Sequence, residues 1–382
     1  MTLGFLRFCY VAILFSGGDY RSLRAGDLLR WTAHCAFGSI LRFHGNNHRP
    51  WSYGPMVEST IRQYITTRYK LAPSLIAAGE HATRTGFPFV TRCDLVWPEY
   101  PAAQSNNQYV FLNDTLVAPI FDTLRNLTGD PVSVWIPPGT WVDAWTGEAV
   151  MGPRHITASQ PFERIPLWHK QDGAMTILTD KPGMRIAQQD WSSLTLDVRL
   201  PATVAEARTA VGEEGSALTV VEEDTTLKTG GDMLVLAERA LHYPAKFKAK
   251  TSVVVQAPEK ATIFLALRMN RTSSPRRRAV LEITAASDGT ARSWVVRVHL
   301  RPLERVVTAR LEGTQPIAAE ALASSHLWPL NASATNRSKS LCDVRFFPFG
   351  GQGACPSSMA GPIFELRLES SAHARLLHLE LE

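Results

Sequence analysis

The chain has 382 residues, of which 45% are hydrophobic and 20% charged, and its formal net charge is +5. This length predicts two or three domains of about 150 residues each, and the composition is that of a folded globular protein rather than a disordered one. The densest basic run, residues 276–278 (RRR), lacks interleaved aromatic residues. We therefore expect a solvated loop there and no nucleic-acid partner.

The apolar run at residues 8–15 (FCYVAILF) has two interpretations. It is too short to cross a bilayer, and it fits either the apolar part of a signal peptide or, as we prefer, a buried parallel strand. Sequons of the N-x-S/T type favour a secreted or endomembrane-lumenal chain. They begin at Asn113, Asn126, Asn270, Asn331 and Asn336. The sequence predicts no membrane span.

The five cysteines show no spacing typical of metal ligands, so we expect neither a metal nor a cofactor. Cys342 and Cys355 flank a glycine-rich stretch, residues 349–353. They are compatible with a small-loop disulfide in an oxidising compartment or with two buried thiols.

Helical periodicity dominates the first hundred residues. Residues 27–37 (DLLRWTAHCAF) have the spacing of an amphipathic helix, and a longer helical stretch runs from Val57 to Arg84. Pro73 should kink or divide this longer stretch, because proline removes a helical hydrogen bond.

Short apolar segments separated by turns follow from about residue 108, and the sequence predicts strands there. They are residues 109–112, 116–121, 132–136 and 141–145, with a turn at Pro137–Gly139 between the last two. Strict alternation of apolar and polar residues returns at 294–300, 364–368 and 377–381. This pattern is typical of antiparallel strands with one solvent-exposed face. Trp135, Trp141 and Trp145 alternate as core residues do, although such a row can also form a stacking platform for sugars.

Seven segments resemble, in order and spacing, the end of the catalytic region in glycoside hydrolase family 31, the α-glucosidase type. They are residues 27–31 (DLLRW), 36–44 (AFGSILRFH), 48–53 (HRPWSY), 68–74 (RYKLAPS), 85–98 (TGFPFVTRCDLVWP), 108–119 (QYVFLNDTLVAP) and 134–147 (VWIPPGTWVDAWTG). The likeness extends over about residues 26–180, and residues 191–200 resemble the start of the family's distal β domain. Ser74 stands where the family usually has an aromatic residue.

The resemblance implies an α/β plus all-β architecture, namely the C-terminal remnant of a (β/α)8 barrel followed by antiparallel β-sandwich domains. We expect the last barrel units in residues 1–105, a proximal β domain in 106–182, a distal β domain in 183–260 and a further β-rich region in 261–382. A complete barrel needs about 250 residues. The first 105 residues have room for about two of its eight units.

Retaining hydrolysis of α-glucosides is the activity that the resemblance implies, and it needs two carboxyl groups about 5–5.5 Å apart. In the family both are Asp residues upstream of the matched region, in D-x-N and W-x-G-D motifs that this sequence lacks. Asp19 falls in the family's D-I-G-G turn and is expected to be a turn residue. We therefore predict no catalytic residue in this chain.

Sugar binding is the role that the resemblance leaves to this chain. His44 matches the family histidine that hydrogen-bonds the sugar, Arg42 would orient the loop or a carboxylate, and Tyr20 lies near the place of an aromatic wall residue. Outside this context, His44 and Arg42 would be solvated surface residues. The expected ligand is an α-glucoside or a related carbohydrate.

Two functional hypotheses remain open at this point. The first is a family 31 glycosidase represented by a portion without its catalytic nucleophile and acid/base, and inactive alone. The second is a non-catalytic β-rich protein, derived from the same family, that binds carbohydrate or another protein. We prefer the first hypothesis.

Overall fold

The computed structural model describes residues 24–43, 49–105, 107–120, 131–161, 163–171, 175–183 and 190–200, together with strands or short segments at 233–244, 260–270, 277–283, 291–300, 306–311, 317–318, 332–337, 363–371 and 375–381. The described residues divide into two compact units. Unit 1 contains residues 24–69 and 88–170, and unit 2 contains residues 70–87 and those from 171 onward. The apolar run at 8–15 and the Cys342–Cys355 pair lie outside the described residues.

Unit 1 begins with helices. They are α2 (Ala25–Ala36), the 3-10 turn η1 (Pro50–Tyr53) and α3 (Pro55–Lys70), followed by the short α5 (Cys93–Val96) and η2 (Pro101–Gln104). Leu28 and Leu29 of α2 pack with Val57 and Ile61 of α3 in a small core. The predicted helix over residues 27–37 is confirmed.

The predicted division of the longer helical stretch at Pro73 is also confirmed. The first helix, α3, ends at Lys70, and α4 (Ala72–Thr85) begins at Ala72 with Pro73 in its first turn. Proline is tolerated there because the first N–H groups of a helix have no intrahelical partner. Gly86 ends α4 in the left-handed conformation and donates its N–H to Ala82 O.

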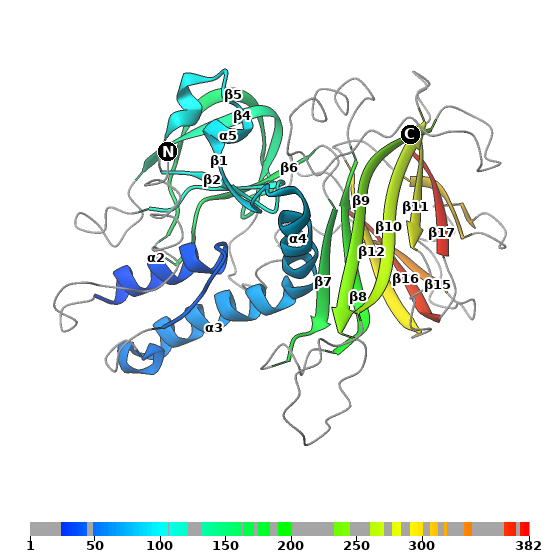
Figure 1. The fold of residues 1–382 in the computed structure, drawn as a ribbon, viewed down its shortest axis with the longest axis horizontal. Helices are drawn as coiled ribbons and strands as arrows, with labels where there is room; N and C mark the ends of the chain where they lie inside the picture. Colours follow the sequence, from blue (N-terminus) through cyan, green and yellow to red (C-terminus); the bar gives the residue numbers. More distant parts are fainter. Residues whose placement is uncertain are drawn as a thin grey trace. The chain divides into compact units, whose positions relative to one another are not determined.

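A six-stranded sheet completes unit 1 (Figure 1). Its order is β1–β2–β3–β6–β4–β5, and all the pairs are antiparallel. The strands are β1 (Val90–Arg92), β2 (Tyr109–Phe111), β3 (Thr115–Val117), β4 (Val132–Asp143), β5 (Ala149–Ala158) and β6 (Leu167–Lys170). The prediction of a turn at Pro137–Gly139 is wrong, because β4 continues through these residues. Its pairing with β5 is irregular there.

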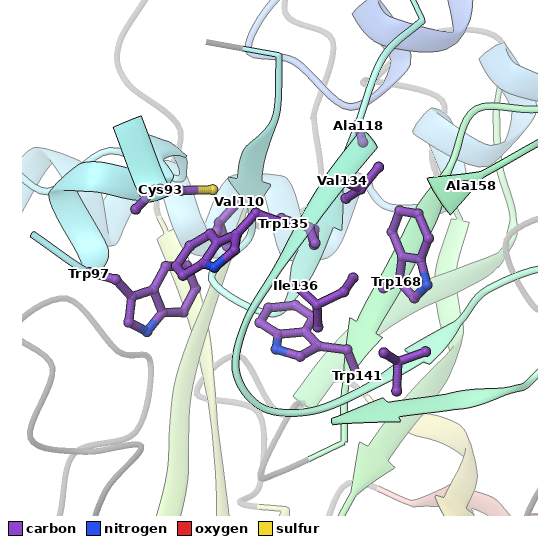
Figure 2. Close-up of a cluster of buried hydrophobic side chains, with 13 residues drawn as sticks. Cys93, Trp97, Val110, Ala118, Val134, Trp135, Ile136, Trp141, Ala158 and Trp168 are labelled. Atoms are coloured by element: carbon purple, nitrogen blue, oxygen red, sulfur yellow. The ribbon is translucent and has the colours of Figure 1, made fainter. Parts of the chain in front are cut away.

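Tryptophan side chains form the core of this sheet (Figure 2). Trp97 makes edge contacts with Trp135 and Trp141, at centroid distances of 5.9 and 6.2 Å. Trp135, Trp141 and Trp145 are all at most 5% exposed. The interpretation of this row as core is therefore confirmed, and these rings offer no exposed platform for sugars.

Unit 2 contains α4 and two further sheets (Figure 1). One has the order β15–β16–β12–β8–β7 and the other β14–β13–β17–β11–β10–β9. The strands are β7 (Met175–Lys181), β8 (Asp190–Arg199), β9 (Met233–Pro244), β10 (Lys260–Asn270), β11 (Arg277–Ile283), β12 (Arg292–His299), β13 (Val306–Leu311), β14 (Ile317–Ala318), β15 (Ala332–Arg337), β16 (Ile363–Ser371) and β17 (Arg375–Leu381).

The alternation read from the sequence matches the burial in these strands. Trp294, Val296 and Val298 of β12 are buried, as are Leu377 and Leu379 of β17. The expectation of antiparallel sheets needs one correction, because β8 pairs with β12 in parallel, whereas the other pairs among the described strands are antiparallel. The described part of the chain is thus mainly strands with a few helices, and none of those helices has the length and apolarity needed to span a bilayer.

Candidate sugar-binding segment

The segment that carries the candidate residues begins where α2 ends. Ala36 is the last residue of the helix, and the N–H groups of Phe37 and Gly38 turn back onto the carbonyls of His34 and Cys35, both at 3.1 Å. Beyond this turn the chain is exposed at Ser39 and Ile40. We refer to residues 37–43 as the 37–43 segment.

Arg68 of α3 holds the beginning of this segment. Its Nη1 donates to Ala36 O at 3.0 Å and to Gly38 O at 2.7 Å, and its Nη2 donates to Ser39 O at 2.8 Å. The last carbonyls of a helix lack intrahelical partners and carry the negative end of the helix dipole, so a cation is stabilising there. Burial lowers the pKa of Arg68 from its ordinary value, but an arginine remains protonated in proteins.

Phe43 holds the other end of the segment. Its ring is half-buried and packs against the cluster of Leu28, Leu29, Val57 and Ile61. The residues between the two attachments include Arg42, whose side chain is exposed. The backbone that carries Arg42 is therefore fixed on both sides, while its guanidinium is accessible to a solute.

The sequence-predicted site residues are described unequally. Arg42 lies within the described residues, whereas His44 and Tyr20 lie outside them. The described part of the chain contains no group of three or more His, Cys, Asp or Glu side chains arranged to hold a metal ion. The residues that sequence reasoning missed are Arg68, Tyr64 and Tyr109, which belong to the framework around the segment.

Tyr64 ties α3 to the chain that leads into β6. Its hydroxyl donates to Glu163 O at 2.7 Å and accepts from the N–H of Ile165 at 3.2 Å. The ring is fully buried, and this burial raises the pKa of Tyr64 far above its ordinary value. Tyr64 therefore remains a neutral phenol that can both donate and accept.

Two further aromatic contacts tie α2 to β2. The hydroxyl of Tyr109 lies 3.2 Å from both Nδ1 and the carbonyl oxygen of His34, and Phe37 meets Phe111 edge to face at 5.6 Å. All four side chains are buried. The sheet of unit 1 thus supports both helices from which the 37–43 segment is held.

The buried thiols near this framework are poorly suited to covalent catalysis. Burial raises the pKa of Cys35 and of Cys93 to about 12 in each case. Since the thiolate is the nucleophile, thiols with such pKa values are inert at neutral pH. Burial also lowers the pKa of His34 to about 4, so this imidazole is neutral. The described geometry is that of an exposed segment held at both ends by contacts with the two helices.

Two family models match the chain in succession. The glycosyl hydrolases family 31 TIM-barrel domain matches residues 18–78, and the glycosyl hydrolase family 31 C-terminal domain matches residues 86–175. The first match contains α2, α3 and the 37–43 segment. The second contains the sheet that supports them.

Curated relatives match the same region over a small part of their own length. Alpha-glucosidase 2 of Bacillus thermoamyloliquefaciens is 30% identical over 171 residues, which are 42% of this chain and 21% of the relative. An alpha-xylosidase of Saccharolobus solfataricus is 26% identical over 188 residues, 48% of this chain and 25% of the relative. The chain thus spans a quarter or less of these two relatives.

Solved structures share the fold at low sequence identity. A Flavobacterium johnsoniae GH31 dextranase, complexed with glucose, matches 93% of this chain and 37% of its own, with a TM-score of 0.59 and 15% identity. Residues 18–78 and 86–175 of this chain therefore match glycoside hydrolase family 31, in the order of the family's TIM-barrel and C-terminal domains.

Proposed function

We propose that this chain supplies one wall of the sugar site of a retaining, α-glucosidase-like glycosidase that hydrolyses O-glycosyl bonds. The observation that carries the proposal is the fixed 37–43 segment inside the barrel-domain match, because it presents an exposed Arg42 two positions before His44, which matches the family's sugar-binding histidine. Tyr20 belongs to the same proposed wall. Residues 1–105 would then be the last units of the barrel.

The ligand that we propose is an α-glucoside or a related carbohydrate. Relatives support this choice by their own ligands, since the Flavobacterium dextranase is complexed with glucose and, as a D412A mutant, with isomaltotriose. A guanidinium and an imidazole are donors that match sugar hydroxyls. Neither can replace the attacking carboxylate of a retaining glycosidase.

Bond cleavage needs the nucleophile and the acid/base, which the motifs of this sequence do not include. General acid catalysis by a positioned carboxyl contributes about 10²–10⁴-fold, and attack on the anomeric carbon needs a second carboxylate. We therefore expect the chain alone to release no aryl alcohol from an aryl α-glucoside above a heat-killed control. Clear turnover would contradict this expectation.

Sugar binding is tested separately from turnover. D-glucose and isomaltotriose are titrated into the purified chain and followed by saturation-transfer NMR. His44→Ala should abolish the measurable affinity, whereas His155→Ala, which removes an exposed histidine of β5, should leave it unchanged. Absence of binding in the unaltered chain, or unchanged binding in His44→Ala, would refute the proposed role.

A further inference from the structure

Arg68 of α3 is hydrogen-bonded to the end of α2 and the residues after it. The hydrogen bonds that the structure gives its guanidinium go to backbone atoms alone. All three acceptors are carbonyl oxygens, and they belong to three residues within a stretch of four, Ala36, Gly38 and Ser39. Its planar fork suits this task, because fixed N–H directions specify where each carbonyl must lie. A lysine would bring the charge to the same place but could not fix three carbonyl positions.

The three carbonyls lie where helical pairing has ended. Gly38 O and Ser39 O follow the last residue of α2, so the helix does not supply their partners. The side chain that satisfies them comes from a position 29–32 residues later in the chain. The path of the backbone from Ala36 to Ser39 therefore depends on Arg68 as well as on the local hydrogen bonds of Phe37 and Gly38.

Arg42 lies three residues beyond this attachment and one residue before Phe43. Ser39 is held by Arg68 and Phe43 by the apolar cluster, so residues 40–42 lie between two attachments, and the backbone of Arg42 also takes part in an isolated β-bridge. Such a short connection has few alternative paths, so removing one fixed point increases the space that Arg42 samples. Holding a binding group before the ligand arrives reduces the ordering cost of binding.

We propose that Arg68 is a positioning residue for sugar binding, which it supports by fixing the backbone of the 37–43 segment and thereby the place of Arg42. The proposal rests on the proposed sugar site. Arg68 itself does not contact the sugar in this scheme. It acts through the three carbonyl oxygens.

The test compares Arg68→Lys and Arg68→Met with Arg62→Met in the full chain. Arg62 lies on the same helix but forms an exposed ion pair with Glu58, so it is the matched control. Affinity for isomaltotriose should fall about tenfold or more in Arg68→Met and by a smaller factor in Arg68→Lys. Hydrogen exchange should accelerate in a peptide covering residues 36–43, and Arg62→Met should change neither measurement.

A double variant separates positioning from general loss of stability. If Arg68 acts through the segment that carries Arg42, Arg68→Lys combined with Arg42→Ala should bind no more weakly than Arg42→Ala alone, because coupled sites are not additive. Multiplied losses in the double variant would overturn the proposal. Unchanged affinity in Arg68→Lys, with faster exchange in residues 36–43, would also overturn it.

Failure of the underlying sugar site has a different signature. In that case the unaltered chain binds no isomaltotriose, and the proposal for Arg68 falls with the site. If Arg68→Met does not fold, Arg68→Lys and the double variant still decide the question, because lysine keeps the charge at the end of α2.

Discussion

The hydroxyl of Tyr109 and Nδ1 of His34 lie 3.2 Å apart in a buried contact between β2 and α2. The same hydroxyl reaches the carbonyl oxygen of His34, also at 3.2 Å. This pair joins residues that are 75 positions apart in the chain. It also places a titratable imidazole where water cannot solvate its charged form.

Acid should therefore destabilise unit 1 through His34. Burial lowers its pKa from the ordinary 6.5 to about 4. Between these pH values the imidazole binds a proton in the unfolded chain but not in the folded one. The contribution of His34 to the free energy of unfolding is therefore fully present above pH 6.5 and is lost as the pH falls towards 4. This loss amounts to about 2 kcal/mol between pH 7 and pH 5.

Urea titrations at several pH values would measure this effect. His34→Gln keeps a polar side chain but does not titrate, so its stability should vary less over the same pH interval. An equally steep decline in His34→Gln would show that another group is responsible.

Tyr64→Phe should weaken the attachment between α3 and residues 163–165. The variant preserves the ring but removes an acceptor from the Ile165 N–H and a donor to Glu163 O. Leaving buried backbone groups unpaired costs about 1–3 kcal/mol. Urea denaturation should report that loss, and Tyr69→Phe, on the same helix, serves as the control. Equal stability in the two variants would contradict the role given to the Tyr64 hydroxyl.

The side-chain amide of Gln108 pairs with the backbone of Trp135 in β4, as the backbone of a neighbouring strand would. Its Nε2 donates to Trp135 O at 2.7 Å and its Oε1 accepts from the Trp135 N–H at 2.9 Å. Gln108→Glu has the same shape but places a carboxylate oxygen against the carbonyl, so we expect a loss of about 1–3 kcal/mol at neutral pH. Protonation restores a donor, and the loss should shrink as the pH falls.

The control for this change is Gln104→Glu in η2, which is exposed. Its thermal midpoint should remain within about 1 °C of the unaltered chain, since surface substitutions usually cost under about 0.5 kcal/mol. A large shift in Gln104→Glu would mean that added negative charge, and not the lost donor, explains the result.

Gly152→Ala should be the most damaging of these substitutions. A Cβ at Gly152 would lie 1.9 Å from Pro137 O and 2.5 Å from Ile136 O, both backbone atoms of β4. Neither can move without separating the two strands, so we expect a loss of more than about 3 kcal/mol or no soluble product.

Gly79→Ala provides the opposite expectation for the same chemical change. Gly79 lies within α4, and nothing approaches its added Cβ within 4 Å. Alanine is favoured over glycine in a helix by about 1 kcal/mol, so the thermal midpoint should rise. Similar effects of the two substitutions would contradict the close approach at Gly152.

The sequence by itself determined the resemblance to the family and the local elements. Motif order placed residues 26–180, and the family models match 18–78 and 86–175. Periodicity located α2, the division at Pro73 and the buried faces of β12 and β17. These features could be predicted because the helix and strand periods depend on residues that are close together in the sequence.

Only the tertiary structure decided how the candidate segment is held. Arg68 meets carbonyls about thirty residues earlier, and Tyr64 meets Glu163 across 99 positions. No local pattern specifies such partners, because they depend on which strands and helices become neighbours. The same reason explains the turn wrongly predicted at Pro137–Gly139, where pairing with β5 before and after an irregularity carries β4 through these residues. The motif thus identified the candidate segment, and the contacts between elements determined its framework.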